Sequence, residues 1–139
     1  MESLYTAEAL STGHGRTGRV DTPDGSLGLV MAPPAALGGS GQGSNPEQLF
    51  AAGYAACFHS ALHAVARSQK LSIVDSSVGG RVHLHREGQG FKLSVELEVV
   101  LPNIPQEQAQ ALADAAHQVC PYSNATQGNI QVIINVSDD

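Results

Sequence analysis

The two cysteines are the side chains of this sequence with the greatest capacity for chemistry. Cys57 and Cys120 are the only thiols in a chain of 139 residues. A thiol attacks an electrophile as its thiolate, and an apolar environment raises the pKa of a thiol, so a reactive cysteine there needs a cation nearby. Without one, each cysteine is expected to be a small buried apolar residue. The cations that either thiol could reach therefore decide between these two interpretations.

Histidines on the segment around Cys57 do not supply that cation. At about 100° per residue, a regular helix turns His59 about 200° and His63 about 120° away from Cys57. The two histidines share a face with each other, four residues apart. A zinc site there would need further ligands that the sequence does not show, so we expect packed or exposed histidines and keep a structural metal site as the alternative.

Arginine is the other possible cation. Arg16 and Arg19 lie in a glycine-flanked turn, and Glu47 could hold a guanidinium through two hydrogen bonds. On one straight helix, however, Glu47 and Cys57 would lie about 15 Å apart and about 80° around the axis. A shared site therefore needs either a long arginine that bridges much of this gap or a second chain whose helix runs antiparallel.

Composition excludes several classes of partner. The net charge is −6 with only 7 Lys and Arg residues, which leaves no cationic stripe for nucleic acid or an anionic membrane surface. The longest apolar run, residues 49–58, is far shorter than the roughly 18–20 residues that span a bilayer. The first residues do not have the layout of a signal peptide, so we expect a cytoplasmic protein. Charged residues form only 14% of the chain, below the average of about 25%, which favours an oligomer.

The elements that must position these side chains can be read from periodicity and from turn residues. Asn45 can cap a helix that Pro46 begins, and the apolar residues after it predict a buried helix that ends near Gln69. Short strands and turns fill the first thirty residues, and a loop rich in Gly and Pro follows. Leu4–Ala7 and Ser26–Met31 are among those short strands, and the later elements are strands at 77–86, 91–101 and 129–136 and a helix at 106–119. We expect one α+β domain, residues 1–139, with antiparallel sheets wrapped around a long buried central helix.

Two segments carry a family resemblance. They are residues 45–58, Asn-Pro-Glu-Gln-Leu-Phe-Ala-Ala-Gly-Tyr-Ala-Ala-Cys-Phe, and residues 119–126, Val-Cys-Pro-Tyr-Ser-Asn-Ala-Thr. Both closely resemble the signature segments of the organic hydroperoxide resistance branch of the OsmC/Ohr family. The resemblance extends over essentially the whole chain, from the N-terminal Leu-Tyr-Thr-Ala to the strand that follows Gly128.

The resemblance implies a cysteine-based peroxidase for organic hydroperoxides. It makes Cys57 the attacking cysteine, Cys120 the resolving cysteine, and Arg16 with Glu47 the pair that stabilises the thiolate. The family usually reads Gly-Gly-Arg-Asp-Gly where this chain reads Gly-His-Gly-Arg-Thr-Gly. Arg19 is therefore the alternative to Arg16, which we favour because a glycine precedes it.

The resemblance also implies the partners. The family forms an intertwined homodimer with both sites at its interface, needs no metal, flavin or haem, and is re-reduced by a dihydrolipoyl group on a partner protein. Phe50, Tyr54 and Phe58 would form an apolar wall that suits alkyl or lipid hydroperoxides. The alternative function is a non-catalytic, redox-switchable dimer, which would act as a stress sensor or a carrier.

Overall fold

A computed structural model describes all residues from Met1 to Asp139 and divides them into two compact units. The N-terminal unit is Met1–Leu49, and the C-terminal unit is Phe50–Asp139. The single domain expected from chain length stays a prediction. The α+β class is confirmed, because each unit contains a three-stranded sheet and three α-helices follow the first sheet along the chain.

Short antiparallel strands form the sheet of the N-terminal unit. The strands β1 (Leu10–Thr12), β2 (Arg19–Asp21) and β3 (Gly28–Val30) pair in that order, and a 3-10 helix, η1 (Ala35–Leu37), interrupts the loop after them. The strand expected at 4–7 is absent, and the first strand begins at Leu10 instead. Leu4 and Tyr5 are exposed and pair with no strand, so apolar residues alone did not specify an element there.

A reciprocal pair of hydrogen bonds begins the long helix α1 (Pro46–Ser68). The Gln48 N–H donates to Asn45 Oδ1 at 2.8 Å, and the Asn45 N–H donates to Gln48 Oε1 at 3.2 Å. This capping box satisfies two backbone donors that the first helical turn leaves unpaired. The predicted cap at Asn45 and start at Pro46 are therefore confirmed.

The sheet of the C-terminal unit combines both strand directions. Its strands β4 (Ser77–Glu87) and β5 (Gly90–Val100) pair antiparallel, whereas β6 (Val132–Ser137) pairs parallel with β5. The expectation of purely antiparallel sheets was therefore wrong for the last strand. Two helices, α2 (Gln106–Val119) and α3 (Pro121–Thr126), lie between β5 and β6 and return the chain to the end of the sheet where β5 begins.

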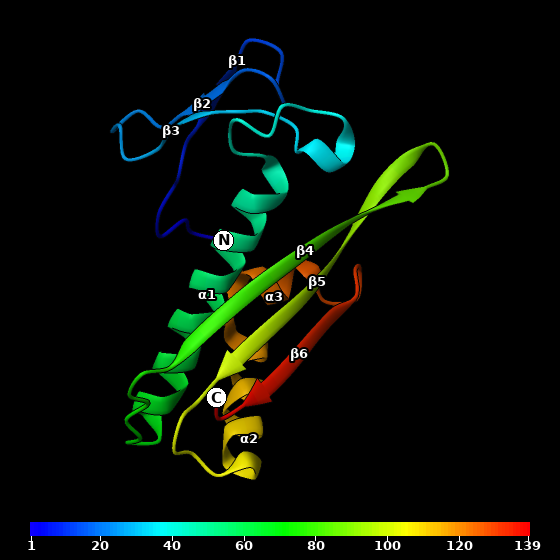
Figure 1. Ribbon diagram of the computed structural model, residues 1–139. Helices are drawn as coiled ribbons and strands as arrows, with labels where there is room; N and C mark the ends of the chain where they lie inside the picture. Colours follow the sequence, from blue (N-terminus) through cyan, green and yellow to red (C-terminus); the bar gives the residue numbers. More distant parts are fainter. The chain divides into compact units, whose positions relative to one another are not determined.

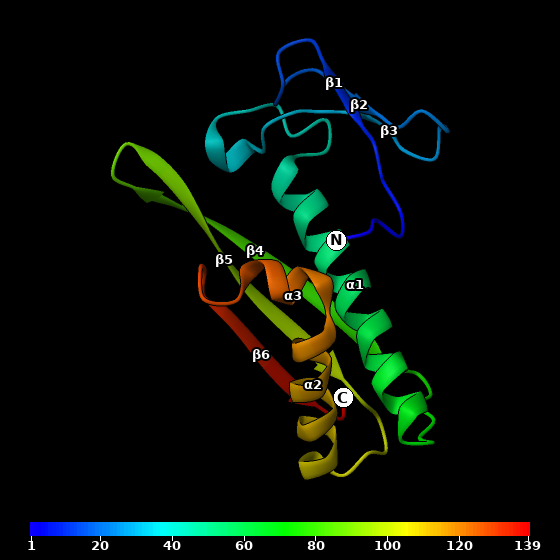
Figure 2. The same cartoon turned by 180° about the vertical axis from the view of Figure 1, so that it is seen from behind.

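The helices cover one face of this sheet, as the two opposite views show (Figures 1 and 2). Tyr54, Phe58 and Leu62 of α1 are fully buried, whereas Ala52 and Ala56 on its other side are exposed. The helix was expected to be buried all round, but within one chain only the face toward the sheet is covered. By length and composition α1 is apolar enough to cross a membrane, a test that a core helix also passes. The core of this unit includes Tyr54, Phe58, Leu62, Val95, Leu97, Val99, Leu112, Ala113, Ala116 and Cys120.

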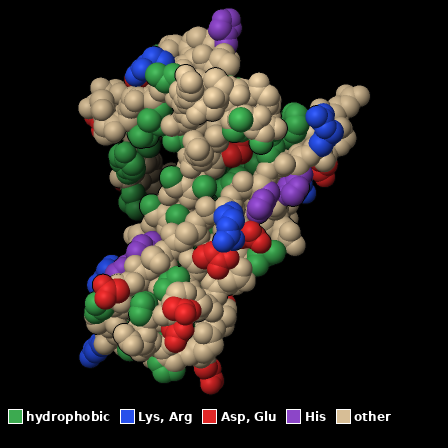
Figure 3. Space-filling model, in the orientation of Figure 1, with side chains coloured by type: hydrophobic (Ala, Val, Ile, Leu, Met, Phe, Trp, Pro, Cys, Tyr) green, Lys and Arg blue, Asp and Glu red, His purple; other side chains and the backbone are tan.

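The opposite face of the sheet is charged (Figure 3). Arg81 Nη1 on β4 donates to Glu98 at 3.1 Å and to Glu96 at 3.3 Å, both on β5, and His83 bonds Glu96 at 3.1 Å. Successive residues of a strand point to opposite faces, so these polar residues alternate with the apolar residues of the core. The sheet therefore has one core face and one polar face.

Candidate active site

Cys57 lies near the middle of helix α1, in the C-terminal unit. The side chain is half-buried, and Cys120, at the junction between α2 and α3, is fully buried. Both cysteines are free. Although they are far apart in the sequence, they lie close enough for the Cys120 side chain to influence the ionisation of Cys57. The fold therefore brings together the two thiols that the sequence singled out.

The surroundings of Cys57 within this unit favour the neutral thiol. Burial raises the pKa of Cys57, the backbone N–H of Tyr122 lowers it by a hydrogen bond, and the neighbouring Cys120 raises it further. No cation of the C-terminal unit contributes to this shift. A thiolate at neutral pH therefore needs a positive charge from outside the unit.

The turn between β1 and β2 presents Arg16 in the N-terminal unit. Gly15 adopts a left-handed backbone (φ 69°), and the Gly18 N–H donates to the Gly15 carbonyl at 3.0 Å, so Arg16 lies at the tip of a tight turn. A side chain at Gly18 would collide with the carbonyl oxygen of Thr12, which explains the second glycine. Both glycines thus serve to place Arg16.

Glu47, in the first turn of α1, holds the Arg16 guanidinium. Arg16 Nη1 donates to Glu47 Oε2 at 3.1 Å, and Nη2 lies 2.9 Å from Oε1 in an ion pair whose N–H is not directed at that oxygen. The Glu47 side chain is only 15% exposed, against 47% for Arg16. Arg19 instead pairs with Asp21 two residues away, at 2.8 Å. Of the two arginines, only Arg16 is joined to Glu47.

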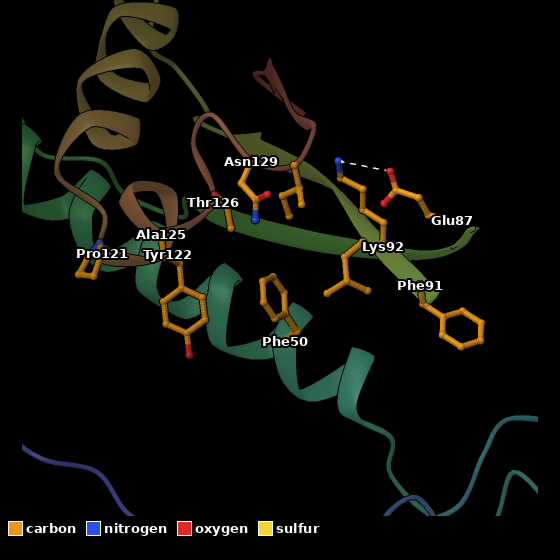
Figure 4. A pocket seen from close by; sticks show the side chains of 11 residues that line it. Phe50, Glu87, Phe91, Lys92, Pro121, Tyr122, Ala125, Thr126 and Asn129 are labelled. Carbon is orange, nitrogen blue, oxygen red and sulfur yellow. Dashed lines mark ion pairs between the residues drawn. The ribbon is translucent and has the colours of Figure 1, made fainter. Parts of the chain in front are cut away.

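An apolar pocket of about 740 Å³ lies in the C-terminal unit (Figure 4). The Phe50 and Tyr122 rings contact edge to face, with centroids 6.0 Å apart, and form one wall. Lys92 and Glu87, 4.0 Å apart, are its charged residues. Tyr122 also provides the backbone N–H that Cys57 accepts, so the pocket shares a residue with the thiol site. The lining residues are Phe50, Glu87, Phe91, Lys92, Leu93, Pro121, Tyr122, Ala125, Thr126, Asn129 and Ile130.

The expected apolar wall is only partly exposed to this pocket. Phe50 lines it, whereas Tyr54 and Phe58 are fully buried in the core and do not. Tyr54 packs against both Phe50 and Tyr122, with ring centroids 6.1 and 5.7 Å away. Tyr54 therefore supports the wall from behind.

The histidines of α1 contact each other. The His59 and His63 rings are 4.9 Å apart, and both Nε2 atoms approach Ser76 Oγ, at 2.9 and 3.3 Å. Burial and the neighbouring His63 lower the pKa of His59. No three His, Cys, Asp or Glu side chains come together in a group that could hold a metal ion.

Fold and site together define an α+β protein with an adjacent pair of free thiols. The sequence profile of the OsmC-like protein family matches residues 39–135. This match covers most of the chain, including both thiols and residues of both units. The chain belongs to the OsmC-like family.

Relatives narrow the position within the family. A protein of Xanthomonas axonopodis pv. citri, named Organic hydroperoxide resistance protein, is 49% identical over 140 residues, which are 96% of this chain and 95% of the relative. The crystal structure of an organic hydroperoxide resistance protein OsmC from Legionella pneumophila is 50% identical, with a TM-score of 0.94, and covers 98% of this chain and 99% of its own. A Vibrio cholerae structure with captopril bound in one of its active sites is 46% identical, with a TM-score of 0.92, and covers 98% and 94%.

Sequence reasoning missed the contributions of α3. Helix α2 ends at Val119 as predicted, but no element was expected directly after it. Proline suits the first position of a helix, and a new helix begins at Pro121. Tyr122 and Ser123 of this helix face the site, and both were already visible in the second signature segment. The sequence signal for α3 was Pro121, because proline is common at the first position of a helix.

Proposed function

We propose that this chain reduces organic hydroperoxides to alcohols, with Cys57 as the attacking thiol and Cys120 as the resolving thiol. The observation that carries the proposal is the adjacency of the only two cysteines, both free, beside an apolar pocket. Relatives named for organic hydroperoxide resistance support a role in peroxide detoxification.

The proposed reaction has two chemical steps. The Cys57 thiolate attacks the distal peroxide oxygen, the O–O bond breaks, and the alkoxide takes a proton and leaves as an alcohol, so that Cys57 becomes a sulfenic acid. The Cys120 sulfur then attacks the Cys57 sulfur and expels the hydroxyl as water. One peroxide is thereby reduced by two electrons, and the dithiol is oxidised to a disulfide.

Arg16 is the cation that this mechanism requires. A guanidinium lowers the pKa of a thiol next to it and can donate hydrogen bonds to the peroxide as its O–O bond breaks. Glu47 fixes the Arg16 side chain by the ion pair already described. In our proposal Arg16 reaches Cys57 either from the same chain or from a second copy.

A homodimer is part of the proposal. The exposed small side chains of α1, among them Ala52 and Ala56, allow a second helix to approach closely. The Vibrio cholerae relative has more than one active site, which agrees with repeated sites in an oligomer. Leu4 and Tyr5 are exposed apolar side chains that a second copy would cover.

The aromatic wall determines which hydroperoxides fit, and a reductant restores the two thiols for the next turnover. Phe50 and Tyr122 suit an alkyl or lipid hydroperoxide, because their pocket is mainly apolar. The family resemblance favours a dihydrolipoyl dithiol as the reductant, which attacks the disulfide, restores both thiols and becomes a cyclic disulfide. A cytoplasmic location, which keeps thiols reduced, fits this cycle.

Turnover is the experiment that tests this function. Purified protein is mixed with cumene hydroperoxide and dihydrolipoamide, and the loss of peroxide is followed over time. We expect many equivalents of peroxide to be consumed per chain, and much slower consumption with glutathione. Equal rates with and without the protein would refute a peroxidase.

One observation favours a second function, the redox-switchable dimer without catalysis. Within its own unit Cys57 has a raised pKa, as expected for a thiol that reacts slowly. Such a switch would consume one peroxide per chain and then stop, even with a dithiol in excess. The same assay therefore distinguishes the two functions.

A further inference from the structure

A polar network, formed by the side chains of Tyr54, His117, Ser123 and Thr126, joins α1, α2 and α3. Tyr54 Oη lies 2.8 Å from Ser123 Oγ and 3.1 Å from Thr126 Oγ1, and His117 Nδ1 lies 2.8 Å from Ser123 Oγ. Tyr54 and Ser123 are fully buried, and Thr126 is 5% exposed. A buried polar group without a hydrogen-bond partner destabilises the fold, so we expect every bond of this polar network to be made.

Only one assignment of donors and acceptors makes every hydrogen bond of this polar network. Thr126 Oγ1 donates to the Ser123 carbonyl at 3.2 Å, so its hydroxyl must accept from Tyr54. Tyr54 then accepts from Ser123, and Ser123 accepts from a protonated His117 Nδ1. His117 is thus a donor, a role that both its imidazolium and the tautomer with the proton on Nδ1 can fill.

The thiols lie on or between the elements that these bonds join. Tyr54 is one helical turn before Cys57 on α1, and Cys120 is the residue between α2 and α3. Ser123 ties α3 to α1 through Tyr54, and it ties α3 to α2 through His117. The backbone on both sides of Cys120 is therefore fixed relative to the helix of Cys57.

We infer that Tyr54, Ser123 and His117 are positioning residues that hold Cys120 where it can attack Cys57 after oxidation. The inference rests on the proposed function and assigns these residues to its second step. Disulfide formation needs the two sulfurs at a narrow range of distances and angles, and small displacements slow such a step strongly. The first step requires Cys57, its activating charge and the peroxide, and its one contact with α3 is the Tyr122 backbone N–H, so we expect it to depend only weakly on this polar network.

A slow second step has a chemical consequence that can be measured. A sulfenic acid that is not captured reacts with a second peroxide molecule, which gives a sulfinic acid and another alcohol. The sulfinic acid carries two added oxygens and cannot form the disulfide. Without the positioning contacts, Cys57 should therefore be oxidised irreversibly to the sulfinic acid instead of forming the disulfide with Cys120.

Separate measurement of the two steps tests the inference. Reduced Tyr54→Phe, Ser123→Ala and His117→Leu are mixed with excess cumene hydroperoxide, and intact masses after acid quenching give the thiol, disulfide and sulfinic fractions. We expect the loss of the Cys57 thiol to stay within about twofold of the unmodified chain, and disulfide formation to slow by at least about tenfold, with sulfinic acid accumulating. His117→Asn, which keeps a donor near Nδ1, should restore most of the rate.

Matched controls separate positioning from a general loss of stability. Val99→Ala removes core volume on β5, an element that carries neither thiol and none of these hydrogen bonds, and should leave the second step within about twofold. Equal slowing in Val99→Ala, no slowing in Ser123→Ala, or no rescue by His117→Asn would each overturn the inference. If Tyr54→Phe does not fold, the Ser123 and His117 variants still decide the question.

Diamide distinguishes failure of this inference from failure of the proposed function. It oxidises two neighbouring thiols to a disulfide and is itself reduced to a hydrazine, without a peroxide. Fast diamide oxidation of the unmodified chain and slow oxidation of Ser123→Ala would support the positioning role even if peroxide leaves Cys57 untouched. Equally fast oxidation of both proteins would contradict it, whatever the peroxidase assay shows.

Discussion

The two units of this chain use different interactions to prepare a side chain for chemistry. In the N-terminal unit, a two-glycine turn and a capped helix start bring Arg16 and Glu47 together, and Met31 and Ala32 are its only buried apolar residues. In the C-terminal unit, a core from three helices and a sheet brings Cys57 and Cys120 together. Local geometry places the charge, whereas long-range packing places the thiols.

This difference has a chemical consequence. Core packing excludes water, which raises the pKa of Cys57 and makes its thiol less reactive at neutral pH. An ion pair at a turn keeps its guanidinium partly exposed and available to another group. In the proposed mechanism, therefore, neither unit has an activated nucleophile by itself, and activity depends on bringing the two kinds of site together.

Replacement of the nucleophile should have the largest effect. Cys57→Ser retains the size of the side chain, but its hydroxyl does not ionise near neutral pH, so peroxide consumption should fall to the background rate. The assay is cumene hydroperoxide loss with dihydrolipoamide. Retention of measurable turnover in this variant would show that Cys57 is not the nucleophile.

Replacement of the second thiol should separate oxidation from turnover. Cys120→Ser should consume the first equivalent of peroxide at nearly the normal rate, because Cys57 and its activating charge are unchanged. Steady-state consumption should then fall at least about tenfold, since no internal disulfide forms. Trapping of the Cys57 sulfenic acid with dimedone measures the first product, and unchanged turnover would exclude Cys120 as the resolving residue.

Removal of the Arg16 charge should shift the pH dependence of the rate at which peroxide oxidises Cys57. Without Arg16, burial keeps the pKa of Cys57 above its ordinary value, so the thiolate fraction at neutral pH falls. Arg16→Ala should slow the first oxidation by about 100-fold at neutral pH, and its rate should rise with pH where that of the unmodified chain is already constant. Stopped-flow oxidation across a pH series measures both effects.

Arg19→Ala is the matched control for this change. Arg19 is paired with Asp21 and is not joined to Glu47, so its removal should leave the pH profile within about twofold. A shift in Arg19→Ala and none in Arg16→Ala would transfer the role to Arg19. Coincident profiles for all three proteins would mean that the N-terminal unit does not activate Cys57.

The smallest effect concerns packing within the C-terminal unit. A Cβ at Gly80 would lie 2.9 Å from the Ala51 carbonyl oxygen of α1, so Gly80→Ala should reduce the free energy of unfolding by about 1–3 kcal/mol. A Cβ at the adjacent Gly79 would meet Glu98 Cβ at 3.8 Å, an ordinary contact. Gly79→Ala should therefore stay within about 0.5 kcal/mol in urea unfolding, and equal losses would contradict the close approach of β4 to α1.

Much of the fold was predictable because its elements carry strong local signals. The helix at 106–119 is confirmed at both ends, β4 extends one residue further than predicted, and β5 begins and ends one residue earlier than predicted. The direction of β6 was not predictable from its apolar residues, since the same pattern fits either direction in a sheet. The direction of β6 follows from the connection through α2 and α3, and α3 was not predicted.

The site was predictable only to the level of candidate residues. Spacing could exclude His59 and His63 as partners of Cys57, because helical geometry is regular. Spacing could not decide between Arg16 and Arg19, since that depends on which carboxylate each one meets in the fold. The bonds among Tyr54, His117 and Ser123 join residues far apart in the sequence, and no local pattern encodes them.

The most direct test of the central claim is the identity of the bond that peroxide produces. Reduced protein is treated with one equivalent of cumene hydroperoxide. The intact mass, measured under denaturing conditions without reductant, shows whether two chains are joined, and mass spectrometry of a digest made without reductant identifies the linked cysteines. Our account predicts one dominant cross-linked pair of peptides, Cys57 with Cys120 of the same chain, which disappears on addition of dihydrolipoamide. Two unmodified thiols, or a disulfide between two chains, would contradict it.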